Sequence, residues 1–233
     1  MKKVSSLAAI LIGLAIFTSA QQTVFNVPTA DILENGKVYF EIDMSFKAVN
    51  QEALRKFSSF VPRIVAGIGK NLELGLNLTG NVKPGADTTT LVPAIKWRFY
   101  QNDEKSLTLF TGQNFYIPVR NKSYKFGSYT YIAASKTIHK TRFTTGGFVF
   151  SKNVVAPNAI RGGGQFAIEQ TITSKLNLNI DWFTGKHSNG YLTTGAAYKL
   201  TKKLTGIASY SFGNSDLLKG NHYMYFELGY NFN

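Results

Sequence analysis

The chain has 233 residues, no cysteine and a formal net charge of +13 at pH 7. The absence of cysteine excludes a disulfide scaffold, and it excludes a lipoprotein because lipid attachment needs a cysteine at the cleavage point. Basic chains can bind nucleic acid, but the N-terminus of this one predicts export. We therefore expect anionic lipid head groups or anionic solutes as partners, and no nucleic acid.

Residues 1–20 are predicted to be a Sec-type signal peptide that is cleaved after Ala20. Two lysines precede an apolar run from Leu7 to Phe17, which is too short to cross a membrane, and small residues follow it. The remaining residues, 21–233, are predicted to form a single β-barrel domain, with 21–35 as a periplasmic N-terminal segment. After residue 20 no apolar run approaches the roughly 18 residues of a transmembrane helix.

Apolar and polar residues alternate in several stretches of the chain. The clearest cases are VYFEIDMSFK at 38–47, LELGLNLT at 72–79 and LNLNIDW at 176–182. A period of two residues puts the apolar side chains on one face of a strand and the charged ones on the other. These stretches are therefore predicted to be strands with one apolar and one polar face.

Turn signals divide the chain into about twelve such strands, most of them near the 9–11 residues that a tilted strand needs to cross a bilayer. The predicted spans are 37–47, 57–68, 72–82, 90–100, 106–117, 127–138, 141–151, 163–173, 176–185, 191–200, 204–212 and 222–232. The alternation slips in the fifth to seventh strands, so their faces, and the face of Arg142, are left unassigned.

Short and long connections alternate along the chain. The short ones lie at 69–71, 101–105, 139–140, 174–175 and 201–203, and most of the others are longer. The predicted fold class is therefore all-β: an up-and-down antiparallel transmembrane β-barrel of about twelve strands, with short periplasmic turns and longer external loops. A secreted soluble barrel or sandwich has the same strand period and is the alternative, although it gives no reason for the loops to alternate.

The last residues, FELGYNFN, alternate Phe226, Leu228, Tyr230 and Phe232. This pattern resembles the C-terminal assembly signal of bacterial outer-membrane β-barrel proteins, except that Asn233 follows the final aromatic residue. The resemblance implies a small porin-like or channel-like barrel in the outer membrane of a Gram-negative bacterium. It also implies outer-membrane lipids, the barrel-assembly machinery and periplasmic chaperones as partners.

Residues 186–190, KHSNG, raise the possibility of a hydrolase. His187-Ser188-Asn189-Gly190 resembles the His-x-Ser-Asn-Gly signature of outer-membrane phospholipase A, but the intervening residue is missing. Adjacent strand residues point to opposite faces, so His187 could not easily take the proton of Ser188. A loop whose Ser-Asn-Gly supplies turn chemistry is the favoured interpretation. No catalytic residue, metal site or cofactor is predicted.

The charged strand faces are predicted to line the lumen. The lumen-lining residues are Glu41, Asp43, Lys47, Glu73, Lys96, Arg98, Lys136, Glu169, Asp181, Lys199 and Glu227. They could form salt bridges that hold a narrow barrel together, or a pore that orients a polar solute. The leading hypothesis is a monomeric passive channel for small polar or ionic solutes. The alternatives are a lipid hydrolase using His187 and Ser188, and a closed structural or adhesion barrel.

Overall fold

The computed structural model describes residues 23–79, 89–120 and 125–232. The predicted signal peptide at 1–20 lies outside these residues. Within them, no helix is long and apolar enough to cross a membrane. The one short helix that the structure shows there is the 3-10 turn η1 (Leu217–Lys219), which lies in the loop before the last strand.

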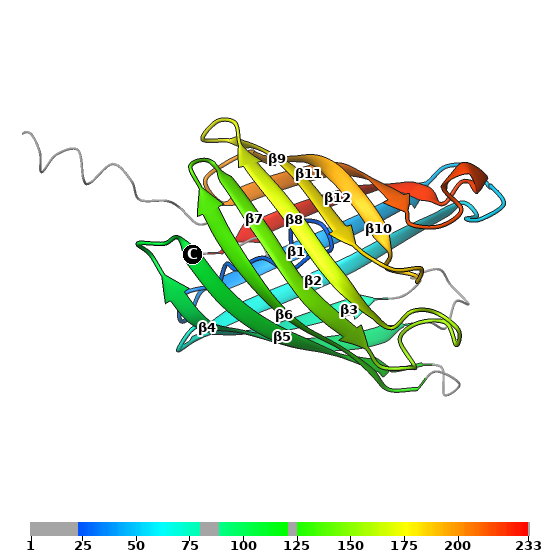
Figure 1. Cartoon of the computed structure of the whole chain (residues 1–233), viewed down its shortest axis with the longest axis horizontal. Coiled ribbons are helices and arrows are strands. Elements are labelled where there is room, and N and C mark those ends of the chain that lie inside the picture. The colour runs from blue at the N-terminus through cyan, green and yellow to red at the C-terminus, as the bar shows by residue number, and fades with distance from the viewer. Residues whose placement is uncertain (1–22, 80–88, 121–124, 233) are drawn as a thin grey trace, which may run out of the picture.

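Twelve antiparallel strands form a closed barrel in simple chain order, and β12 pairs with β1 to complete it (Figure 1). The strands are β1 (Val38–Lys47), β2 (Phe57–Gly69), β3 (Leu72–Thr79), β4 (Thr90–Asn102), β5 (Leu107–Pro118), β6 (Gly127–Ile138), β7 (Thr141–Phe150), β8 (Gly162–Thr171), β9 (Leu176–Phe183), β10 (Tyr191–Lys199), β11 (Leu204–Gly213) and β12 (His222–Asn231). The predicted fold class is confirmed, and the predicted strand ends lie within three residues of the observed ones.

The two ends of the barrel differ in their connections. The turns at 70–71, 139–140 and 200–203 lie at the end where β1 begins and the chain terminates. The longer loops at 48–56 and 151–161 lie at the opposite end. In Figure 1 the C-terminus marks the short-turn end. We call these the short-turn end and the long-loop end.

The outer face of the wall is apolar. Ile64, Leu76 and Ile180 are each more than 40% exposed although they lie in the middle of strands. Leu76 belongs to the predicted alternation of β3, whose polar partner Asn77 is buried on the inside. A continuous apolar exterior is unfavourable in water and favourable in lipid, so the barrel is built to span a membrane.

The inner face of β5 to β9 carries many aromatic side chains beside a few charged ones. Tyr129, Phe148, Phe150 and Phe183 are buried inside the barrel, and the ring centroids of Phe148 and Phe183 lie 4.8 Å apart. Since apolar residues occupy both faces of these strands, the alternation between apolar and polar residues is lost there. This explains why the sequence pattern leaves the fifth to seventh strands unassigned.

Candidate functional site in the barrel lumen

The residues that precede β1 lie inside the barrel. The backbone N–H groups of Phe25, Asn26 and Val27 all donate to one carboxylate oxygen, Oδ2 of Asp181 on β9, at 3.0, 2.5 and 2.8 Å. A tight turn, closed by the Val24 N–H to Val27 carbonyl bond of 2.8 Å, points these donors in one direction. Successive backbone amides of this kind form a concave anion-binding site, which here takes a side chain of the wall.

A second group of contacts holds this segment closer to the short-turn end. Arg142 on β7 binds Asp31 through two hydrogen bonds of 2.7 and 2.9 Å. It also binds Glu169 on β8 through two more, so one guanidinium joins the segment to two strands. Glu73 on β3 accepts the Leu33 N–H at 3.0 Å. Residues 23–33, which we call the inner segment, therefore run along the lumen.

Apolar contacts add to the hold on the inner segment. Val24 and Val27 are fully buried, and Phe25 is 2% exposed with its ring edge-on to Tyr225 of β12. Each fully buried valine or phenylalanine side chain is worth about 1.5–3 kcal/mol relative to exposure. The inner segment is thus held by both polar and apolar groups of the wall.

The periplasmic segment predicted at 21–35 consequently needs correction over residues 23–33. These residues have no strand or helix period, so the sequence pattern gives them no place in the wall. The informative signal is that Val24, Phe25 and Val27 are close together in a segment expected to be exposed to water. Burial of these side chains inside the lumen is the physical reason for the observed position.

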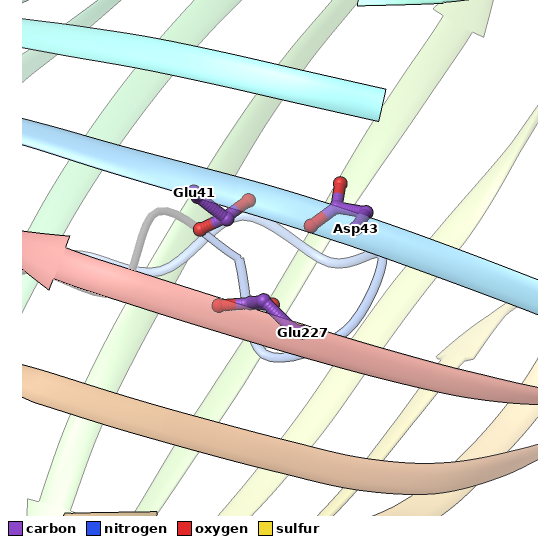
Figure 2. A group of neighbouring side chains, drawn as sticks. All are labelled: Glu41, Asp43 and Glu227. Atoms are coloured by element: carbon purple, nitrogen blue, oxygen red, sulfur yellow. The ribbon is translucent and has the colours of Figure 1, made fainter. Parts of the chain in front are cut away.

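Three carboxylates converge on the wall where the barrel closes. Glu41 and Asp43 come from β1 and Glu227 comes from β12, as Figure 2 shows. Each offers an oxygen within 4.8 Å of the others, and Arg63 on β2 lies 2.5 Å from Glu41 and 3.2 Å from Asp43. Tyr39 donates to Glu227 at 3.3 Å. We call these four charged residues the closure cluster.

Within the part of the chain that the structure describes, the carboxylates of the closure cluster are the one group with a geometry that could hold a metal ion. The guanidinium of Arg63 already supplies a positive charge to two of them. Buried carboxylates need such a counter-charge because an unpaired buried charge is strongly unfavourable. The cluster is therefore best understood as an ion-pair network that joins the first, second and last strands.

A cavity of about 300 Å³ lies between the inner segment and the wall formed mainly by β1 to β6. Glu73 and Lys96, which pair at 2.8 Å, line its part toward the short-turn end. Asn114 lines the wall of β5, and Ser45 and Asn189 line the part toward the long-loop end. The cavity therefore follows the barrel axis beside the inner segment, and most of its polar lining can form hydrogen bonds with a solute.

Most of the predicted lumen-lining residues are buried on the inner face. These are Glu41, Asp43, Lys47, Glu73, Lys96, Glu169, Asp181 and Glu227. Arg98 and Lys199 are half-buried near the short-turn end, where Arg98 donates to Asn71 at 2.8 Å. The ammonium of Lys47 binds the carbonyls of Gly220 and His222, so this residue ties loops together at the long-loop end.

Lys136 was predicted to line the lumen and instead lies exposed on the outer face of β6, next to the short-turn end. Its neighbour Ser135 is 3% exposed and occupies the inner face with Tyr131 and Ala133. Lys136 is close enough to the strand end for its long side chain to reach polar head groups. Sequence reasoning also missed Arg63 and Arg142 as lumen residues.

His187 serves the structure of its own loop. One ring nitrogen, Nε2, lies 2.9 Å from the Thr184 carbonyl, and the other, Nδ1, accepts the Asn189 N–H at 3.2 Å. The ring packs edge-on against Phe148 and Phe150, and burial lowers the pKa of His187. Because both ring nitrogens have backbone partners, neither is placed to take a proton from Ser188.

The residues of the predicted assembly signal lie on the outer face of the last strand. Phe226, Leu228, Tyr230 and Phe232 are 37–50% exposed, and the rings of the last two pack edge-on. They lie beside β1, because Leu228 pairs with Ile42 where the barrel closes. Their role in assembly stays a prediction.

No protein-family model and no curated protein matches the chain. Among solved structures, it is similar to a KdgM porin in complex with disordered oligogalacturonate, with a TM-score of 0.59, 8% identity, and coverage of 84% of this chain and 99% of the porin. It is also similar to the COG4313 outer membrane channel from Pseudomonas putida F1, with a TM-score of 0.52, 11% identity, and coverage of 87% and 98%. Outer membrane phospholipase A from Escherichia coli gives a TM-score of 0.47 and 13% identity, with coverage of 85% and 90%.

The closed strand order and these similarities give the chain the fold of bacterial outer-membrane β-barrels. Within that class it is a twelve-stranded barrel with an N-terminal segment inside the lumen.

Proposed function

We propose that the protein is a channel of the bacterial outer membrane that gives passive passage to small polar or ionic solutes. The observation that carries this proposal is the cavity of about 300 Å³ beside the inner segment, which is lined by both polar and apolar residues inside a barrel whose exterior is apolar. A lumen that served only to hold the barrel together would fill this space with side chains, because protein interiors are close-packed. The similarity to two outer-membrane channels supports the proposal at the level of the fold.

The inner segment sets how open the channel is. It occupies part of the cross-section and is anchored at Asp181, Arg142 and Glu73. The remaining cavity has the volume of a small solute rather than of a wide aqueous pore. We therefore expect a small conductance for the intact protein, and a larger one when the inner segment is loosened.

Ion conductance across a planar bilayer tests the channel directly. Asn114 lines the cavity, so Asn114→Asp should shift the reversal potential under a salt gradient toward cation selectivity, and Asn114→Lys should shift it toward anions. The matched controls are Asn158→Asp and Asn158→Lys in an exposed loop, which should leave the reversal potential unchanged. Absence of conductance, both in the intact protein and after loosening of the inner segment, would support a closed structural barrel instead.

The remaining features of the proposal concern location and partners. The chain is exported, its signal peptide is removed after Ala20, and it inserts as a monomer among outer-membrane lipids with the help of periplasmic chaperones and the barrel-assembly machinery. We propose no enzymatic activity, because His187 is engaged with its own loop. Fractionation with outer membranes, and a mature N-terminus at Gln21 by mass spectrometry, would test these points.

A further inference from the structure

We propose that the lumen is a binding site for short acidic peptides, and that the inner segment occupies this site as an internal ligand. This inference rests on the proposed channel function and names a class of solute for it. The inner segment shows which groups of the wall can hold a peptide, because it is itself an eleven-residue stretch without regular secondary structure, and most of its polar contacts with the wall are made by its backbone. Some of its contacts depend on the side chains of this particular sequence, and others do not.

Several of the contacts need no particular side chain. The Asp181 carboxylate accepts three successive backbone N–H groups, those of Phe25, Asn26 and Val27. The ammonium of Lys96 donates to the Thr29 carbonyl at 3.3 Å, and Glu73 accepts the Leu33 N–H at 3.0 Å. Every peptide has such donors and acceptors, so these groups can recognise a peptide backbone whatever its sequence.

One contact requires a negatively charged side chain on the peptide. The Arg142 guanidinium grips both oxygens of Asp31, in the planar two-bond geometry that distinguishes a carboxylate from an amide or a hydroxyl. Glu169 fixes the guanidinium from the other side, so the arginine is already oriented when a carboxylate arrives. A peptide with an aspartate at this position gains the same pair, and an uncharged residue there does not.

The geometry also allows exchange. The inner segment makes no strand ladder with the wall, and a cavity of about 300 Å³ lies directly beside it. A free peptide can therefore approach the wall groups while the inner segment moves aside. Against a tethered competitor it must be supplied at high concentration, since a short tether gives an effective concentration of the order of millimolar.

The test uses the full-length protein carrying Asp31→Asn, which weakens the hold of Arg142 on the inner segment and leaves every wall group in place. Three synthetic peptides are added during bilayer recordings. The first has the sequence of residues 23–33, the second has asparagine in place of its aspartate, and the third is a scrambled version of the first. Heat-modifiable migration on gels confirms that the variant is folded. The intact protein is recorded in parallel, and its occupied site should make it less sensitive to the peptides.

We expect the first peptide to reduce the conductance of the Asp31→Asn channel at a concentration at least tenfold lower than the second or third. In the Asp31→Asn, Arg142→Gln double variant, this preference for the aspartate should disappear. Equal potency of the first and second peptides, or no block by any peptide of an Asp31→Asn channel that conducts, would overturn the proposal. Binding of the labelled first peptide is also followed by fluorescence anisotropy in detergent. Binding without any conductance would reject the channel and retain the peptide site.

Discussion

At the scale of single residues, Arg142 joins the inner segment to the wall, because its guanidinium pairs with both Asp31 and Glu169. Burial raises the pKa of Asp31, but the guanidinium of Arg142, with Lys96 and Arg98 nearby, outweighs this and holds the pKa below its usual value of 3.8. The docked segment therefore favours the ionised form of Asp31. Its ion pair is fully formed above the usual pKa and is lost as the pH falls through the lowered one.

The lowered pKa of Asp31 predicts how the conductance of the channel depends on pH. Conductance of the intact protein should stay constant from pH 7 to about 5 and rise below about pH 4, as Asp31 takes a proton and releases Arg142 to Glu169 alone. The Asp31→Asn variant should have a raised conductance both at pH 7 and below about pH 4. It should lack the step in conductance that comes from protonation of Asp31. The control Asp216→Asn, in an exposed loop, should keep that step. A step that is unchanged in Asp31→Asn would show that protonation of Asp31 does not cause the acid response.

Arg63 should be essential for a stable barrel. Arg63→Met removes the positive charge beside Glu41 and Asp43, which are almost fully buried, and breaking a buried pair in this way costs about 3–5 kcal/mol. The folded fraction after heating or in urea should fall accordingly. Adding Glu41→Gln and Asp43→Asn should restore much of the loss, because Glu227 is then the one carboxylate left in the closure cluster, and the hydroxyls of Tyr39 and Tyr225 donate to it.

For Arg63→Met, a matched control is Arg55→Met in an exposed loop, which should change stability by less than about 0.5 kcal/mol. If the Arg63→Met and Arg55→Met variants were equally stable, a group other than Arg63 would have to compensate the negative charge of the closure cluster.

The loop at 184–190 should show no lipase chemistry. Ser188→Ala should leave both conductance and lipid hydrolysis unchanged, because the ring nitrogens of His187 bind backbone groups of Thr184 and Asn189. His187→Ala should loosen the loop without changing hydrolysis. A phospholipase assay with and without calcium, on the preparations used for the recordings, measures this. Hydrolysis that disappears in Ser188→Ala would contradict the channel interpretation.

Individual residues were predictable where one face of a strand was plainly charged. Glu41, Asp43 and Glu227 belong to clear alternations, and the structure buries all three on the inner face. Arg63 was missed because its inward neighbours on β2, Val61 and Val65, are apolar, so the strand shows no charged face. Pairing between distant residues, such as Asp31 with Arg142, leaves no periodic signal in a single sequence.

At the scale of elements, β12 combines two roles that can be separated by mutation. It closes the barrel against β1, and it carries the predicted assembly signal on its outer face. Phe232→Ala should lower the amount of folded barrel in the membrane much more than Phe212→Ala, although both aromatic rings face outward and each packs on a tyrosine ring. Quantitative immunoblotting of the heat-modifiable form measures both. An equal loss of folded barrel in the two variants would mean that Phe232 is an ordinary packing residue.

The strands and the inner segment differ in how far the sequence specified them. A strand in a barrel repeats its environment every two residues, so its period and its turns can be detected locally. The inner segment has no repeat, and its partners are spread over β3, β4, β7, β9, β10 and β12. Its position depends on a lumen that exists only after the wall has formed, and this explains why the sequence predicted a segment there but not its location.

At the scale of the whole molecule, the alternation of short and long connections was sufficient to predict a barrel. Every strand returns beside its predecessor, so one end collects all the short turns and the other all the longer loops. Closure between β1 and β12 then follows because an open sheet would leave two edges without hydrogen bonds in lipid. The degree to which the lumen is filled could not be predicted, because it depends on side-chain volumes brought together from all the strands.

The contact between the inner segment and Asp181 also has a consequence for the timing of biogenesis. Phe25, Asn26 and Val27 are separated from their acceptor by 154–156 residues of chain. These residues emerge early from synthesis and secretion, yet their binding site is complete only when β9 has emerged and the wall has been assembled. Throughout that interval the apolar side chains of Val24, Phe25 and Val27 have no place to be buried, and the closure of so long a loop is slow. The inner segment can therefore dock only after the wall has formed, and on the proposed export route its exposed apolar residues are a reason for a periplasmic chaperone to stay bound to it until then.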